Sequence, residues 1–198
     1  MSINVAAFDV LKECAEKKSP VFFSTDKVPI VFQTFILKAE NDHILLENRV
    51  TPSHIIEVVK SDKFYLQCQM MRFVSEKIDS NGVHIVFPLE SLVAIEETRQ
   101  ARRFPFEADE RVVVEILNPI DNETMLIKSV MDMSSHGISI KTRYASKLFA
   151  PGTEFKDMRI LIDGNLYNTV SGKVVYGRRF IGIDGKSYNQ IGLQFEDN

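Results

Sequence analysis

From Pro20 onward, the sequence consists of short apolar or alternating runs rich in Val, Ile, Phe and Thr, and turn-forming residues separate these runs. Alternation of apolar and polar residues with a period of two is the pattern of a strand that buries one face. The runs form two series of about six strands each, as in small closed β-structures. We therefore predict a mainly β fold with two small antiparallel β-barrel domains in tandem.

One amphipathic helix is expected before the first strand series. Apolar residues recur there at spacings of three and four behind Ser2 or Asn4 as a cap, which predicts a helix from about residue 5 to about residue 17. The apolar positions are Val5, Phe8, Leu11, Cys14 and Ala15. The strand runs that follow are VFFS, PIVFQTFILKA, HILLEN, HIIEVV, FYLQCQMMRFVSEK and GVHIVFPL.

The second strand series has its own turn signals. They are residues 118–122, Pro151-Gly152, Asp163-Gly164 and Asp184-Gly185. The runs are RVVVEIL, TMLIKSVMDM, GISIKT, EFKDMRILID, LYNTVSGKVVYG and YNQIGLQFE. The two series show no residue-level repeat, so we expect two distinct domains, residues 1–98 and residues 99–198.

Charge excludes a general polyanion binder. Of the 198 residues, the first 98 carry 10 basic and 14 acidic residues (net −4), and the rest carry 14 and 13 (net +1). Proteins that bind nucleic acid polymers tend to have a broad basic surface, so a phosphate ligand here is expected to be small and bound by a local cluster.

The chain also lacks signals for secretion or membrane insertion. Its N-terminal segment does not have the charged-then-apolar order of a secretory signal, and no apolar stretch approaches the roughly 20 residues that a membrane-spanning helix needs. The two cysteines, Cys14 and Cys68, form no CxxC pair and are interpreted as core residues. We expect a cytoplasmic protein.

The connector between the two series, from Glu96 to Glu110, is mostly charged and polar. Pro105 disfavours a helical conformation at Phe104, so we expect the connector to be extended and exposed, at least without a ligand. Two short motifs lie in and after it. Arg99 and Arg103 form R-x-x-x-R within residues 96–105, and MDMSSHGIS contains D-x-S-x-x-G at a predicted strand junction.

With these motifs, residues 99–198 resemble the PilZ domain, a bacterial receptor module for cyclic di-GMP. RQARRFPF matches the arginine motif of that family and DMSSHG its second motif, and PGTEF, VSGKVVYG and IGLQFED follow its pattern. The N-terminal half resembles the accessory domain of YcgR-type flagellar brake proteins in architecture and length. The resemblance implies that Arg99, Arg103, Asp132, Ser134 and Gly137 bind cyclic di-GMP, with Arg102 as a lesser candidate.

The chemistry of these residues suits a ligand with two phosphates and two guanines. Arginine pairs bidentately with phosphate, meets guanine O6 and N7 in the same geometry, and stacks on a base. A carboxylate at Asp132 accepts from guanine N1 and N2, a hydroxyl at Ser134 bonds phosphate or base, and glycine at 137 allows positive φ and close approach. The alternative is that Asp132 and Ser134 only bond the backbone of their own turn.

Two further arginines, Arg178 and Arg179, lie in the turn-like segment YGRRFIGIDG. Of two interpretations, a basic edge of the site and a charged hairpin tip, the hairpin tip is favoured. An enzyme is not expected, because Asp132, Ser134 and His136 are too close in sequence to align as a catalytic triad. The other histidines lack metal-ligand spacing, so we expect no metal and no cofactor other than the ligand.

The function expected is a non-enzymatic receptor that changes its interdomain orientation on binding cyclic di-GMP. The YcgR resemblance implies a protein partner such as a flagellar motor component. Two alternatives stay open: a nucleotide-independent PilZ-like adaptor in pilus or motility assembly, and a barrel that binds single-stranded nucleic acid, although no aromatic stacking series is evident.

Overall fold

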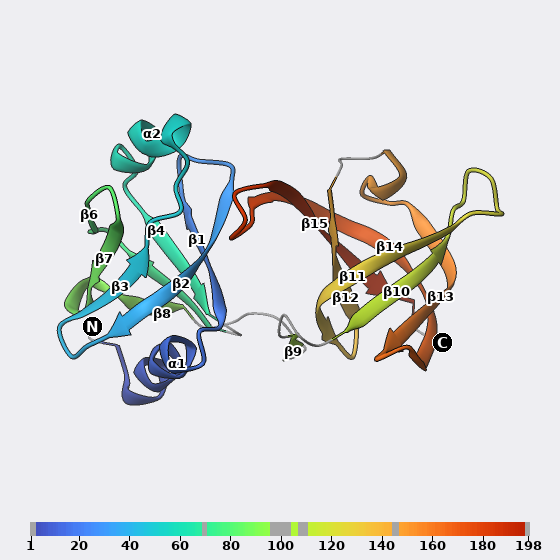
Figure 1. The fold of residues 1–198 in the computed structure, drawn as a ribbon, viewed down its shortest axis with the longest axis horizontal. Coiled ribbons are helices and arrows are strands. Elements are labelled where there is room, and N and C mark those ends of the chain that lie inside the picture. Colours follow the sequence, from blue (N-terminus) through green and yellow to red (C-terminus); the bar gives the residue numbers. More distant parts are fainter. Residues whose placement is uncertain (1–2, 69–70, 96–103, 107–110, 144–146, 197–198) are drawn as a thin grey trace. The chain divides into compact units, whose positions relative to one another are not determined.

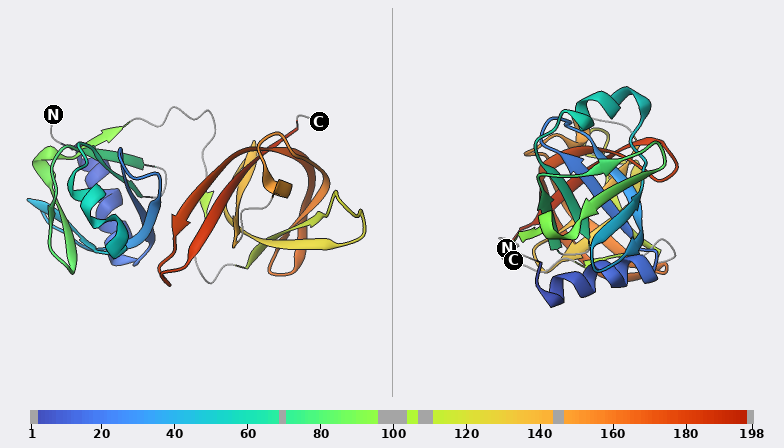
Figure 2. Two further views of the ribbon diagram at one scale, coloured as in Figure 1. Left: turned by 90° about the horizontal axis from the view of Figure 1, so that it is seen from above. Right: turned by 90° about the vertical axis from the view of Figure 1, so that its left-hand side faces the viewer.

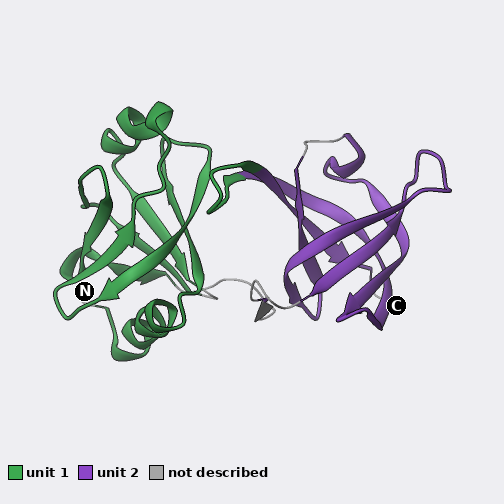
Figure 3. Cartoon of the chain, viewed as in Figure 1, with its two compact units in different colours: residues 1–98, 180–187 green, residues 99–179, 188–198 purple. Residues whose placement is uncertain are grey.

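The structure is a computed structural model that describes residues 3–68, 71–95, 104–106, 111–143 and 147–196 (Figure 1). These residues pack into two compact units, one of residues 1–98 with 180–187 and one of residues 99–179 with 188–198 (Figure 3). The expected fold class, mainly β with an N-terminal helix, is confirmed. None of the helices in the described part of the chain is long and apolar enough to span a bilayer.

The N-terminal helix α1 (Val5–Glu16) lies across one end of the strands of the first unit (Figure 2). It begins where predicted, because the Asn4 side chain accepts a hydrogen bond of 2.8 Å from the Ala7 N–H and satisfies one of the free donors of the first turn. Its buried residues are Ala7, Leu11 and Cys14, so the apolar face is correctly predicted around Leu11 and Cys14. Val5 was placed on this face and is instead 78% exposed.

Among the described residues of the first unit, strands β1 to β8 pair with their neighbours in antiparallel fashion, in the order β8-β5-β4-β1-β2-β3-β7-β6. Alternation of buried and half-buried residues along β1, for example, puts every second side chain into the core, as the sequence pattern predicts. The bounds are β1 (Pro20–Thr25), β2 (Val31–Ala39), β3 (His43–Glu47), β4 (Phe64–Cys68), β5 (Met71–Ser75), β6 (Asp79–Ser80), β7 (His84–Pro88) and β8 (Val93–Ile95).

The prediction of a strand at HIIEVV is wrong. The segment forms a short 3₁₀ helix η1 (Pro52–His54) followed by helix α2 (Ile55–Val59). Pro52 is tolerated in a first helical turn, where no N–H is needed, and a short apolar run does not by itself distinguish helix from strand. Only Val58 of α2 is buried.

Phenylalanine rings pack against one another within the core of the first unit. Phe23 is 1% exposed and lies edge-to-face with Phe87, at 6.1 Å between ring centroids. Burial of one such side chain stabilises a fold by about 1.5–3 kcal/mol. A further 3₁₀ turn, η2 (Leu89–Ser91), leads into β8.

A segment from late in the sequence also belongs to the first unit. Phe180 and Ile181 pair in parallel with Val31 and Phe32 of β2, and Ile181 lies in the same core. The Arg49 guanidinium donates a hydrogen bond of 3.2 Å to the carbonyl oxygen of Ile183.

In the part of the second unit that the structure describes, the strand pairings form a closed ring, β13-β10-β11-β12-β15-β14, with β14 paired back to β13. The strands curve round a common axis (Figure 2). A short strand β9 (Phe104–Pro105) is added beside β11. The bounds are β10 (Val112–Leu117), β11 (Met125–Ser134), β12 (Gly137–Thr142), β13 (Glu154–Ile162), β14 (Asn165–Ile181) and β15 (Ser187–Phe195), with a 3₁₀ turn η3 (Lys147–Phe149) before β13.

Aliphatic side chains fill the ring of strands. Ile138, Ile140 and Leu193 are at most 1% exposed and pack with residues of β10, β13 and β14. Residues between them, such as Ser139, therefore lie on the outer face of the ring. This arrangement places polar side chains of three neighbouring strands next to one another outside the core.

Candidate functional site

Asp132 lies in the middle of three strands. On one side it is paired with Ser139 of β12, and on the other with Pro105 of β9. A register irregularity lies between Val130 and Asp132 of β11. β12 pairs with β11 on both sides of it, whereas on the other edge β10 pairs with β11 before it and β9 after it. The Phe106 N–H donates to the carbonyl oxygen of Met131 at 3.1 Å and extends the contact between β9 and β11.

The Asp132 carboxylate is held by a hydrogen-bond network on the outer face of the second unit. Its Oδ2 accepts from the Ser139 hydroxyl at 2.5 Å and from Nε2 of Gln190 at 3.3 Å. Gln190 Nε2 also donates to the Ser139 oxygen at 3.0 Å, and Gln190 Oε1 accepts from Nη2 of Arg178 at 2.7 Å. Ser139 and Gln190 are 0% and 5% exposed, so the side-chain positions in this network are tightly constrained.

Ser134 makes local contacts at the β11–β12 turn. Its oxygen accepts from the His136 N–H and donates to the Gly137 carbonyl, both at 3.3 Å. The alternative interpretation of this residue, a turn that bonds its own backbone, therefore has structural support. The imidazole of His136 contacts the Ser135 hydroxyl at 2.7 Å and Asp132 contacts Ser139, so the three residues considered for a catalytic triad do not form one.

Gly137 is required by strand packing. Gly152, Gly164 and Gly185 have positive φ, whereas Gly137 does not, although a glycine allows it. A Cβ atom at this position would lie 2.2 Å from the carbonyl oxygen of Leu193 on β15. The glycine thus lets β12 and β15 approach each other. The prediction that it also lets a guanine base approach the backbone does not follow from this packing and stays a prediction.

The arginine motif falls outside the described residues, as do Arg99, Arg102 and Arg103 individually. The next described residue is Phe104, which directly follows Arg103 in sequence and pairs with Met133. Phe104 and Pro105 are extended, as Pro105 predicted. Phe106 is half-buried against the second core, so the connector is not exposed at this residue.

Arg178 and Arg179 do not form a hairpin tip. Both lie within β14, and the turn follows them at residues 182–186. Arg178 is half-buried and joins the network of Asp132 through Gln190, whereas Arg179 is exposed. The segment YGRRF continues the strand because Phe180 and Ile181 are buried and paired with β2. The turn-like composition of IGIDG, which follows, led to the prediction of a turn at the arginines.

Aromatic side chains lie on the same outer face. The ring of Tyr176 occupies the space beside Gly192, where a Cβ atom would be 2.1 Å from it. Lys141 Nζ lies 3.8 Å from the centroid of the Tyr188 ring. The face therefore combines a carboxylate, an amide, cations and aromatic rings, the groups that bind bases and phosphates. Gln190, Tyr176 and Lys141 were missed because their common face follows only from the strand register.

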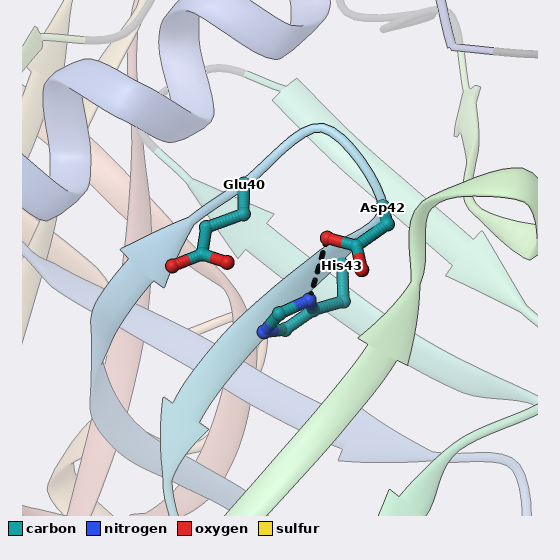
Figure 4. A group of neighbouring side chains, drawn as sticks. All are labelled: Glu40, Asp42 and His43. Carbon is teal, nitrogen blue, oxygen red and sulfur yellow. Dashed lines mark hydrogen bonds and ion pairs between the residues drawn. The ribbon is translucent and has the colours of Figure 1, made fainter.

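A group of side chains in the first unit has metal-ligating chemistry (Figure 4). Ligand atoms of Glu40, Asp42 and His43 lie within 4.8 Å of one another at the turn between β2 and β3. His43 Nδ1 is bonded to Asp42 at 2.8 Å, which lowers the pKa of that carboxyl, and Lys38 lies 3.7 Å from Glu40. The groups already have partners within the turn and near it, and we assign no metal to them.

Comparison with known proteins gives structural neighbours only. No protein-family model matches the chain, and no curated protein matches it. MrkH from K. pneumonia in complex with c-di-GMP has a TM-score of 0.69 at 15% sequence identity, covering 99% of this chain and 87% of that one. A second structure of MrkH, described as a c-di-GMP-dependent transcription regulatory factor, has a TM-score of 0.59 at 15% identity, with 96% and 81% covered. YcgR from Escherichia coli in complex with c-di-GMP has a TM-score of 0.53 at 13% identity, with 99% and 84% covered.

These likenesses establish the fold of the chain as that of PilZ-domain proteins with an N-terminal β-rich domain. The resemblance inferred from the two motifs, including the likeness of the N-terminal half to YcgR, is confirmed at the level of the fold.

Proposed function

We propose that the protein is a cytoplasmic, non-enzymatic receptor for cyclic di-GMP. The observation that carries the proposal is the pairing of Asp132 with Pro105. It joins the second motif to the strand that begins one residue after R-x-x-x-R, although about 30 residues separate the two motifs in sequence. The structural neighbours MrkH and YcgR, both solved with c-di-GMP, support the same ligand.

In the proposed site, Arg99 and Arg103 bind phosphate and guanine, Asp132 accepts hydrogen bonds from a guanine edge, and Ser134 bonds phosphate or base. Arginine is suited to this ligand because one guanidinium pairs with two acceptors and stacks on a ring, which an ammonium does not do. Neighbouring residues of an extended chain point to opposite sides, so a contact of Arg102 with the ligand is the weaker part of the proposal.

Isothermal titration calorimetry with cyclic di-GMP tests the site. We expect Arg103→Ala and, separately, Asp132→Ala to abolish binding while the thermal unfolding midpoint stays nearly unchanged. Arg143→Ala is the matched control, because Arg143 is exposed in the second unit and outside both motifs. Wild-type affinity in both site variants would refute the assignment. Parallel titrations with GTP and a short oligonucleotide distinguish a cyclic dinucleotide receptor from a general nucleotide or single-strand binder.

The proposed output is a change in interdomain orientation that regulates a protein partner, such as a component of the flagellar motor. A ligand shifts such an equilibrium only through its different affinities for the two arrangements, typically by about 1–3 kcal/mol. Small-angle scattering should therefore differ between free and cyclic di-GMP-bound protein. Superimposable curves would contradict the reorientation, and absence of binding in calorimetry would favour a nucleotide-independent adaptor.

A further inference from the structure

Gln190 is the residue that connects the two charged members of the network on the outer face. It is 5% exposed on β15, between β12 and β14. Its oxygen accepts from Arg178 at 2.7 Å, and its nitrogen donates to Asp132 at 3.3 Å and to Ser139 at 3.0 Å. Every polar atom of this side chain therefore has a partner on another strand.

The chemistry of the neighbours fixes the orientation of the Gln190 amide. A guanidinium only donates hydrogen bonds and a carboxylate only accepts them. A side chain that bridges Arg178 and Asp132 must present an acceptor to one and a donor to the other, and an amide of this length does both. The Ser139 hydroxyl is consistent with this orientation of the amide, because it accepts a hydrogen bond from Gln190 Nε2 and donates one to Asp132.

We propose that Gln190 is a positioning residue that orients the Asp132 carboxylate for guanine recognition and couples it to Arg178. This inference rests on the proposed function, since it specifies how the same site achieves its selectivity. Two donors on separate strands, the Ser139 hydroxyl on β12 and the Gln190 amide on β15, hold Oδ2 of Asp132 in one place, so the carboxylate is oriented before ligand arrives. Such preorganisation raises affinity by reducing the ordering that binding requires.

Substitutions of Gln190 separate its donor from its acceptor. Gln190→Glu keeps the size and the acceptor for Arg178 but replaces the donor to Asp132 with a second carboxylate. Gln190→Met removes both functions at similar volume. We expect each to weaken cyclic di-GMP binding about tenfold or more, since a buried polar group loses its partner. Gln67→Met on β4 of the first unit is the matched control, with unchanged binding.

The pH dependence of binding distinguishes positioning from a general packing role. The groups that face residue 190 are Asp132 from β11, Lys141 from β12 and Arg178 from β14, with Tyr188 on β15 itself. In Gln190→Glu, proton uptake by the carboxyl pair restores a donor between residues 190 and 132. The affinity deficit relative to wild type should therefore shrink from about pH 7 to about pH 5, whereas that of Gln190→Met stays constant.

A double-mutant cycle gives a second test if Gln190→Met fails to fold. Arg178→Met should weaken binding, and its combination with Gln190→Glu should cost less than the sum of the single effects, because both act through one network. Arg179→Met, on the neighbouring exposed residue, is the control. Wild-type affinity in the Gln190 variants, or additive effects with no change in pH profile, would overturn the inference. Absence of cyclic di-GMP binding in the wild type would instead overturn the proposed function itself.

Discussion

The carbonyl oxygen of Leu193 lies 2.2 Å from the position that a Cβ atom on Gly137 would occupy. The neighbouring residue Gln194 is the register partner of Gly137, so the clash would fall within the β12–β15 ladder itself. Backbone atoms in a paired strand cannot move aside without breaking hydrogen bonds. The glycine of the second motif is therefore needed for the fold whether or not a ligand is bound.

Gly137→Ala should consequently destabilise the second unit by about 1–3 kcal/mol, the range for overpacking in a close-packed structure. Thermal unfolding followed by circular dichroism measures the effect. Gly177→Ala is the control, because a Cβ there meets only Cδ1 of Ile191 at the ordinary distance of 3.4 Å. A wild-type midpoint for Gly137→Ala would contradict the packing argument, and loss of ligand binding in this variant would not by itself identify a ligand contact.

Ser134→Ala separates the turn role of this serine from a ligand role. Its two local hydrogen bonds are both long, 3.3 Å, so we expect their loss to cost less than about 1 kcal/mol of stability. Affinity for cyclic di-GMP should nevertheless fall, as measured by calorimetry. Ser135→Ala, on the exposed neighbour that contacts His136, should leave affinity unchanged. The reverse result, reduced stability with full affinity, would assign Ser134 to the turn alone.

Most strands were predictable because alternation and turn chemistry are local signals. Asp163-Gly164 and Asp184-Gly185 do lie between paired strands, and both glycines have positive φ. The segment 55–59 was not predictable from its β-branched residues, because strand propensity depends on packing against neighbours, and this segment follows a 3₁₀ turn and buries Val58 alone.

The supporting residues of the site could not be predicted, because they are brought together by the pairing of strands that are distant in sequence. Nothing local to Phe180 indicates that it pairs with β2 in the first unit, because such pairing is decided by packing against distant residues. In the same way, the contact from Gln190 to Asp132 spans 58 residues and depends on the order β11-β12-β15. The motif residues were visible in the sequence, whereas the residues that support them were not.

Core substitutions should distinguish the two units, and they give a direct test for the segment 180–187. Phe73 and Ile140, each 0% exposed, lie in different cores. We expect Phe73→Ala to cost about 3–5 kcal/mol and Ile140→Ala about 2–5 kcal/mol. In hydrogen exchange measured by mass spectrometry, the peptide covering residues 180–187 should lose protection in Phe73→Ala and keep it in Ile140→Ala. Loss of protection in the second variant alone would place the segment with the other unit.

The loop between β10 and β11 should make a pH-dependent contribution to stability through Asp121. Its carboxylate accepts from the N–H groups of Glu123 and Thr124, both at 3.0 Å, and from the Thr124 hydroxyl at 2.7 Å. These bonds favour the charged form and lower the pKa of Asp121 to about 2.

The pKa of Asp121 is lower in the folded than in the unfolded chain. The carboxylate therefore stabilises the fold fully at pH values above the ordinary aspartate pKa of about 4, and this stabilisation is lost as the pH falls towards about 2. A carbon-detected NMR titration should give a midpoint near 2 for this carboxyl group, and Asp121→Asn should flatten the fall in loop protection between about pH 4 and about pH 2. A midpoint near the ordinary aspartate value would show that the loop does not hold the carboxylate in solution.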